Sequence, residues 1–211
     1  MMDARAFQHR LLQRLAGTQP DHDPGRTRIG ARLVRGTDER LLAMMPRESR
    51  AAAVLIGIQE HAGEPAILLT VRAEHLRKHA GQIAFPGGAI DAQDSDPAEA
   101  ALREAREEVG LHAAQARVAG FLPDQVVLTG FRITPVVALI EPQFTPSPDR
   151  TEVQEAFMLP VTALLDVRNH VHGRRIIGGE EFDVRDLAFG SHLIWGATAG
   201  MLFALYELGL E

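Results

Sequence analysis

The sequence has no cysteine among its 211 residues, and it has no excess of basic charge. Without cysteine, disulfide bonds and thiol chemistry are excluded, and a reducing compartment is compatible with the composition. The formal net charge is −6 and the isoelectric point is near 5.8. This acidic balance argues against a nucleic-acid-binding surface as the main function. A small-molecule partner is expected instead, held by a local basic patch and a metal ion.

A secretory or membrane-spanning segment is also missing from the pattern. The start of the chain has an early acid and scattered arginines but no apolar core segment, so it does not resemble a secretory signal. Residues 187–206 contain no Asp, Glu, Lys or Arg, over a length close to the roughly 20 residues that span a bilayer. However, polar residues such as His192 and Thr198 dilute their hydrophobicity, and no basic cluster flanks them. We therefore expect a buried C-terminal helix there, no membrane partner and a cytoplasmic protein.

The remaining pattern indicates mixed α and β structure around one core. Aliphatic runs predict strands at residues 52–58, 66–71, 116–122, 131–140 and 153–159. Residues 174–177 and 181–184 flank a Gly-Gly pair and predict a β-hairpin. A chain of this length can bury one good core.

An amphipathic helix is predicted at the start of the chain. Its apolar positions, at helical spacing, are Phe7, Leu11, Leu12 and Leu15. Residues 18–28 are polar and contain two prolines, which is typical of an exposed linker. The expected division is therefore an N-terminal helical extension and linker, residues 1–30, and a main domain, residues 31–211.

A second helix is predicted between Asp96 and Gly110. Asp96 is a capping residue, Pro97 suits the first helical position, and Gly110 supplies a stop. Small apolar residues at helical spacing would let this helix lie close against a sheet. They are Ala98, Ala101, Leu102, Ala105 and Val109.

Three glutamates, Glu104, Glu107 and Glu108, share a face of this helix beside its apolar stripe. Like charges so close repel each other, so the arrangement is mildly unfavourable as structure alone. A hard divalent cation reverses that sign, because Mg²⁺ prefers carboxylate oxygens, waters and phosphates as ligands. The alternative is a solvated charged face, in which Arg103 pairs with Glu107 four residues along.

The segment FPGG at residues 85–88 comes before the helix, and its adjacent glycines let a backbone approach a ligand closely. Together, the glycine loop and the helix resemble the signature of the Nudix hydrolase family, which ends in Arg-Glu, an apolar residue, any residue, Glu-Glu, any residue, Gly and an apolar residue. The matching positions are Gly88, Arg103, Glu104, Ala105, Glu107, Glu108, Gly110 and Leu111.

The match departs from the family pattern at the first acid of the signature. Asp94 stands in place of glutamate, and it lies nine positions before Arg103 where the family has eight. A one-residue insertion in the loop is the simplest account, since loops tolerate insertions. The roles of Asp94 and of nearby Asp91 stay open at this point.

The preceding residues, 68–88, resemble a narrower branch of the family, the coenzyme A pyrophosphatases. The positions in register are Leu68, Leu69, Thr70, Arg72, Ala73, Arg77, Gly81, Phe85, Pro86, Gly87 and Gly88, and residues 194–199 also look like this branch. Coenzyme A carries a 3′-phosphate beside its pyrophosphate, and guanidinium groups bind such anions well. Arg72 and Arg77, with Lys78, supply that charge, although a solubilising surface cluster is the alternative interpretation.

The resemblance implies an α+β Nudix fold in which a mixed sheet lies between helices, and a possible homodimer. It further implies hydrolysis of coenzyme A or acyl-CoA to 3′,5′-ADP and (acyl-)4′-phosphopantetheine. Glu104, Glu107 and Glu108 would hold Mg²⁺ or Mn²⁺, and Arg103 would orient the glutamates.

The remaining roles concern the substrate and the attacking water. Gly87 and Gly88 would let the loop approach the phosphates. The general base is expected first among the three helix glutamates and second at Glu152, which could also be an ordinary loop acid. Two alternative functions remain: a Nudix hydrolase of another nucleoside diphosphate, such as a sugar or dinucleotide derivative, and a non-catalytic module that senses a nucleotide.

Overall fold

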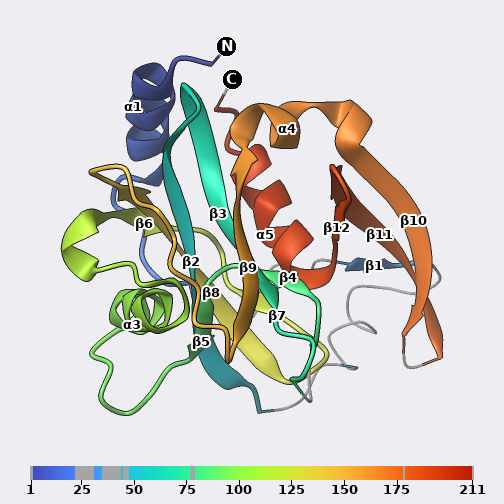
Figure 1. Ribbon diagram of the computed structural model, residues 1–211. Helices are drawn as coiled ribbons and strands as arrows, with labels where there is room; N and C mark the ends of the chain where they lie inside the picture. The colour runs from blue at the N-terminus through green and yellow to red at the C-terminus, as the bar shows by residue number, and fades with distance from the viewer. Residues whose placement is uncertain are drawn as a thin grey trace.

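The computed structural model describes residues 2–21, 31–34, 44, 48–76, 79–177 and 179–210. Their helices and strands form two sheets with helices packed on them (Figure 1). Arg77 and Lys78, expected at the phosphate site, lie outside the described residues, and so does Gly178 of the hairpin turn.

The main sheet has eight strands and contains all five of the strands that the sequence predicts. Its central path is β4 (Ile83–Ala84), β3 (Glu64–Arg72), β2 (Arg50–His61), β8 (Phe131–Ile140) and β6 (Ala116–Phe121). Three further strands pair with this path: β5 (Gly87–Ala89) with β2, β7 (Gln125–Val126) with β8, and β9 (Val153–Pro160) with β3. Among the described strands of this sheet, only β2 and β8 pair in parallel, so the sheet is mixed, as expected.

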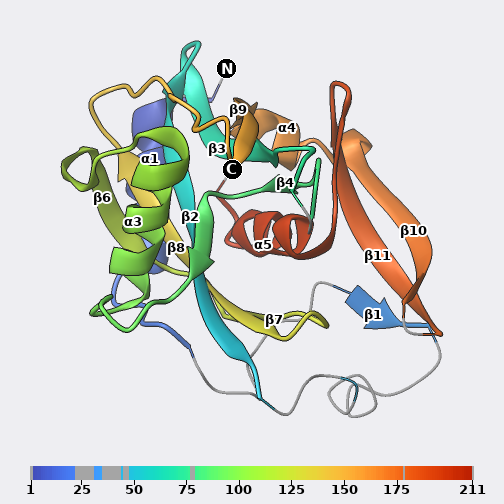
Figure 2. The ribbon, with the colours of Figure 1, turned by 60° about the horizontal axis from the view of Figure 1, so that its bottom comes forward.

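Helices cover both faces of the main sheet. Neighbouring residues on a strand point to opposite faces, so they contact different helices. On β2, Leu55 packs with helix α3 (Pro97–Val109), whereas Ile56 packs with α1 (Ala4–Leu15) and α5 (Gly196–Tyr206). Figure 2 shows α3 on one side of β2 and α5 on the other. The expected α+β architecture, with a mixed sheet between helices, is confirmed.

The predicted amphipathic helix is α1, and it packs into the core of the main sheet. Phe7 and Leu11 are fully buried, Leu15 is nearly so, and Leu12 is partly buried. The chain then turns at Thr18, whose hydroxyl donates to the carbonyl oxygen of Leu15 and accepts from the N–H of Phe121 on β6. The apolar stripe therefore holds the start of the chain against the sheet, while the division at residue 30 stays a prediction.

The second sheet has four strands: β1 (Ala31–Leu33), β11 (Glu180–Phe189), β10 (His170–Ile177) and β12 (His192–Ile194). The predicted hairpin is confirmed, since β10 and β11 pair in antiparallel register up to Ile177 and Glu180. Short helical turns lie between these elements. The turn η1 (Ala113–Gln115) precedes β6, and α4 (Val161–Leu165) and η2 (Val167–Asn169) lie between β9 and β10.

The single helix expected over residues 187–206 is wrong, because only α5 (Gly196–Tyr206) is helical. Leu187 and Ile194 face each other across β11 and β12, and both are buried in the same core as α5. Burial on a strand leaves the same uncharged, apolar composition as burial on a helix, so composition did not separate the two. In the part of the chain that the structure describes, no helix is both long and apolar enough to cross a membrane.

Candidate active site

Helix α3 begins and ends where the sequence predicts. The Asp96 side chain accepts a hydrogen bond of 2.9 Å from the N–H of Glu99, and Pro97 is the first residue of the helix. At the other end Gly110 adopts a φ of 77°, and its N–H bonds back to carbonyls of the last turn. This positive φ favours glycine and stops the helix.

The apolar side of α3 packs closely on β2 and β8. Ala101, Ala105 and Val109 are fully buried, as predicted, and so is Ala100, while Ala98 and Leu102 are partly buried. Because these side chains are mostly alanine, the helix axis lies close to the sheet. The neighbouring acidic face thereby comes against β5, and Glu108 lies near Arg72 at the end of β3.

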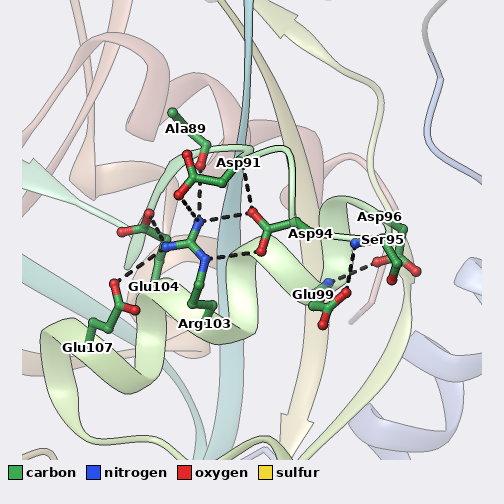
Figure 3. Close-up of polar contacts among 9 residues, drawn as sticks. All are labelled: Ala89, Asp91, Asp94, Ser95, Asp96, Glu99, Arg103, Glu104 and Glu107. Atoms are coloured by element: carbon green, nitrogen blue, oxygen red, sulfur yellow. Dashed lines mark hydrogen bonds and ion pairs between the residues drawn. The ribbon is translucent and has the colours of Figure 1, made fainter.

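Arg103 is the centre of a polar network at the start of the acidic face (Figure 3). Its Nε and Nη2 donate to the two carboxylate oxygens of Asp94, each at 3.0 Å. Its Nη1 donates to Glu104 at 2.8 Å and to Glu107 at 3.4 Å, and Nη2 also reaches the carbonyl of Ala89 at 3.2 Å. One guanidinium therefore fixes two of the helix glutamates against the preceding loop.

The roles of Asp94 and Asp91, which the sequence left open, differ in this network. The Asp94 carboxylate is 4% exposed and makes the paired bonds to Arg103, which hold the pKa of Asp94 below its usual value. The Asp91 carboxylate is 65% exposed and lies 3.8 Å from Arg103. Asp94 is thus the structural partner of Arg103 despite the one-residue departure in spacing.

Glu108 is the deepest acid of the cluster, with a side chain 4% exposed. Its Oε2 is buried without a hydrogen-bond partner among the described residues, and its Oε1 lies 3.9 Å from Nη1 of Arg72. Burial raises the pKa of Glu108 to about 8, against the lowering effect of the Arg72 charge. The charges of Glu104 and Glu152 contribute to this raised pKa, so Glu108 lacks a full counter-charge.

Glu104 is a partly buried acid whose pKa, like that of Glu108, is raised. Burial raises the pKa of Glu104, the Arg103 hydrogen bond and charge oppose that shift, and the charges of Glu107 and Glu152 add to it. Four carboxylates from the helix and from the loop before β9 therefore act on one another. Such mutual repulsion in a partly buried site is relieved by a cation.

Gly87 and Gly88 bring the loop backbone into contact with its surroundings. A Cβ at Gly88 would lie 2.4 Å from Oε1 of Glu104, and one at Gly87 would lie 2.4 Å from the carbonyl oxygen of Ala53 on β2. The N–H of Gly87 also donates a hydrogen bond to Glu108. Both positions therefore require glycine for close packing against the sheet and the acidic face.

A protein-family model described as the NUDIX domain matches residues 48–177. The chain belongs to the Nudix family. It is 40% identical to an Escherichia coli O7:K1 protein named "Uncharacterized Nudix hydrolase NudL", over 162 residues that cover 77% of this chain and 82% of the relative. A protein of the same name from Shigella flexneri serotype 5b is 40% identical over 166 residues, covering 79% and 84%. Among solved structures, the Nudix hydrolase RenU from M. smegmatis aligns with a TM-score of 0.47 at 28% identity, covering 56% of this chain and 75% of that chain.

Nudix hydrolases generally use divalent ions such as Mg²⁺ or Mn²⁺, and the donors of α3 suit such a cation chemically. Carboxylate oxygens are hard ligands, and the buried Oε2 of Glu108 lacks a partner among the described residues. Within those residues no ready-made group of three His, Asp or Glu side chains stands at metal-binding geometry. Arg103 instead occupies Glu104 and Glu107, so a metal would have to compete with this guanidinium.

Two other predicted Nudix site residues, Glu152 and Arg72, lie beside this cluster. Glu152 is exposed just before β9, and its carbonyl accepts from the N–H of Ala73 at 2.9 Å. Arg72 ends β3 and pairs with Val153 of β9. The strand pairing thus brings an acid and a cation, 80 residues apart in the chain, to the same end of the sheet as the helix glutamates.

Proposed function

We propose that this Nudix hydrolase cleaves the pyrophosphate of coenzyme A or acyl-CoA, yielding 3′,5′-ADP and (acyl-)4′-phosphopantetheine, with Mg²⁺ or Mn²⁺ as cofactor. The observation that carries the substrate assignment is the position of Arg72. This arginine belongs to the coenzyme A signature in residues 68–88, and its Nη1 lies 3.9 Å from Glu108. A guanidinium beside the carboxylate cluster can pair with a phosphate oxygen that enters with the cation.

In this proposal the glutamates of α3, Glu104, Glu107 and Glu108, hold the cation. When bound, it neutralises phosphate charge and lowers the pKa of a nearby water. Arg103 keeps Glu104 and Glu107 on the face that meets the loop. Gly87 and Gly88 are proposed to bring the loop backbone, and with it the substrate phosphates, close to the acidic face, because a side chain at Gly88 would displace Glu104.

The bond-breaking step needs one base. Glu152 accepts the proton of the attacking water while the water oxygen bonds to phosphorus and the bridging P–O bond breaks. One feature favours Glu152 over Glu104 and Glu107: among the described residues its exposed side chain has no hydrogen-bond or ion-pair partner, whereas Arg103 holds the other two. The leaving phosphate carries the displaced electron pair.

The proposal also includes the setting expected from the sequence. The catalytic domain is taken as residues 31–211, the enzyme as cytoplasmic, and a homodimer as the assembly that the resemblance implies. Arg77, the second signature arginine, is proposed to contact substrate phosphate together with Arg72.

The test is to incubate the purified protein with coenzyme A and Mg²⁺ or Mn²⁺ and to identify the products by mass. Glu107→Gln is run alongside, because Glu107 is 53% exposed and its removal should leave the fold intact. Formation of 3′,5′-ADP and phosphopantetheine, lost in the variant and in EDTA, is the expected result. Competition by 3′-dephospho-coenzyme A then reports on the 3′-phosphate, whose loss should remove much of the rate.

Other outcomes separate the alternatives. Cleavage of a nucleoside diphosphate sugar or dinucleotide, with coenzyme A left intact, would overturn the substrate assignment and keep the metal site. Binding of nucleotide and Mg²⁺ without any turnover would indicate a sensing module. Arg72→Lys keeps the charge but not the paired donors, so a large rise in KM for coenzyme A is expected for this variant.

A further inference from the structure

The loop before β9, residues 146–152, is docked on the C-terminal end of α3. The N–H of Ser147 donates to the carbonyl oxygen of Val109 at 2.8 Å, and the N–H of Asp149 donates to that of Glu108 at 2.9 Å. The last carbonyls of a helix lack partners within the helix. The loop therefore satisfies them and takes its position from the helix that carries the acidic face.

Asp149 organises the rest of this loop. Its Oδ1 accepts from both the N–H of Thr151 at 2.9 Å and the hydroxyl of Thr151 at 2.8 Å. Its carbonyl oxygen accepts from the N–H of Glu152 at 3.0 Å and from that of Val153 at 2.8 Å. Asp149 thus stabilises a tight turn, and Glu152 lies at the end of that turn.

The same turn is tied from the opposite side to the residues that directly follow β3. The N–H of Ala73 donates to the carbonyl of Glu152 at 2.9 Å, and the ring of His75 donates from Nε2 to the carbonyl of Thr151 at 3.0 Å. This bond gives His75 a structural role in holding the loop. Glu152 is consequently held between α3 and β3, the two elements that carry Glu108 and Arg72.

We propose that Asp149 is a positioning residue for Glu152: it fixes the loop turn so that the Glu152 carboxylate is presented to the acidic face of α3. This inference rests on the proposed role of Glu152 as the general base. Asp149 makes its side-chain contacts within the turn and acts only through the geometry of the loop. A base on a free loop would spend much of its time away from the reacting water, which lowers kcat and leaves substrate binding unchanged.

A double-mutant cycle with Glu152 tests this assignment, using Asp149→Ala, Glu152→Gln and the double variant. Asp149→Ala is expected to lower kcat between about 10- and 100-fold, with little change in KM or in Mg²⁺ affinity measured by calorimetry. In the Glu152→Gln background the same substitution should have almost no effect on kcat, because the group that it positions is gone.

Two control variants separate positioning from simple loss of structure. Asp149→Asn keeps an Oδ1 that accepts both Thr151 bonds, so it should restore most of kcat. Asp166→Ala removes an aspartate of the same kind, whose Oδ1 accepts from the N–H of Arg168 in an exposed turn outside the site, and should leave kcat unchanged.

Three results would overturn the assignment. These are an unchanged kcat in Asp149→Ala, a kcat loss of equal size with and without Glu152, and no rescue by asparagine. If wild-type protein leaves coenzyme A intact, the proposed function fails, and the cycle is run on the diphosphate that the enzyme does cleave. If Glu152→Gln has full activity, Glu152 is not the base, and the positioning role of Asp149 is overturned with it.

Discussion

Asp94 and Arg103 are joined by two parallel hydrogen bonds of 3.0 Å, made between one carboxylate and one guanidinium. The pair holds the loop after Gly88 against the first turns of α3. It also leaves Nη1 of Arg103 free to contact Glu104 and Glu107. The orientation of two proposed metal ligands therefore depends on an acid outside the helix.

Replacing Asp94 by alanine should weaken Mg²⁺ binding by about 10- to 100-fold, because Arg103 is then free to pair more fully with Glu104 and Glu107. Calorimetric titration of Mg²⁺ measures the change. The matched control is Asp91→Ala, which removes a mostly exposed carboxylate 3.8 Å from the same guanidinium and should have little effect. Equal losses in the two variants would contradict the special role of Asp94.

The buried Glu108 makes the metal-free protein sensitive to pH. Its pKa is about 8 in the folded protein and near the ordinary 4.5 when unfolded, so the folded state binds more protons between these values. The free energy of unfolding in EDTA should therefore fall as the pH rises from about 4.5 to about 8, by on the order of a few kcal/mol. Urea unfolding at a series of pH values gives the slope.

Glu108→Gln serves as the control for this pH dependence, since its amide does not titrate. The free energy of unfolding of this variant should decrease much less than that of the wild-type protein across the same pH range. A stability that rises between pH 5 and 8 in the wild-type protein would be evidence against a buried, uncompensated Glu108.

Gly88→Ala should abolish most activity while the protein still folds. The new Cβ would lie 2.4 Å from Oε1 of Glu104, so the glutamate must leave its position. Gly173→Ala on β10 is the matched control, because its Cβ would meet Val184 at an ordinary 3.9 Å. We expect at least a tenfold loss of kcat/KM for the first variant and none for the second, measured on the same substrate. Full activity in Gly88→Ala would show that this contact does not matter.

Thr198 links α5 to the strand that leads into the glycine loop. Its hydroxyl donates to the carbonyl oxygen of Ile83 on β4 at 2.9 Å. Thr198→Val should lower the unfolding free energy by about 1 kcal/mol, because a part-buried carbonyl loses its partner. Thr198→Ser keeps the hydroxyl and should retain the bond at the cost of one methyl group. Thermal unfolding of both variants should show that Thr198→Ser is the more stable. A more stable Thr198→Val would mean that the methyl contact contributes more than the hydrogen bond.

The sequence predicted the parts of the site whose determinants are local. Asp96, Pro97 and Gly110 define α3 by rules that involve only neighbouring residues, and the acidic face follows from the helical repeat. The strand positions likewise follow from aliphatic runs. These features need no knowledge of which segments meet in space.

Contacts between distant segments could not be predicted in the same way. Asp94 matched the family pattern imperfectly, and only the folded loop shows that it pairs with Arg103. The turn at Asp149 was not predicted from the sequence, because its role depends on contacts with the end of α3. The split of residues 187–206 into strand and helix also depends on pairing between β11 and β12, which leaves no distinct local pattern.

The extra residue between Asp94 and Arg103 has a consequence for how such proteins are found. The loop accommodates the extra residue, and the Asp94 carboxylate still bonds to the Arg103 guanidinium. The ion pair therefore depends on the distance between the two charged groups and not on the number of residues between them. A motif search with a fixed gap would score this chain as lacking the first acid. A search that allows either acid and a variable gap would recover it.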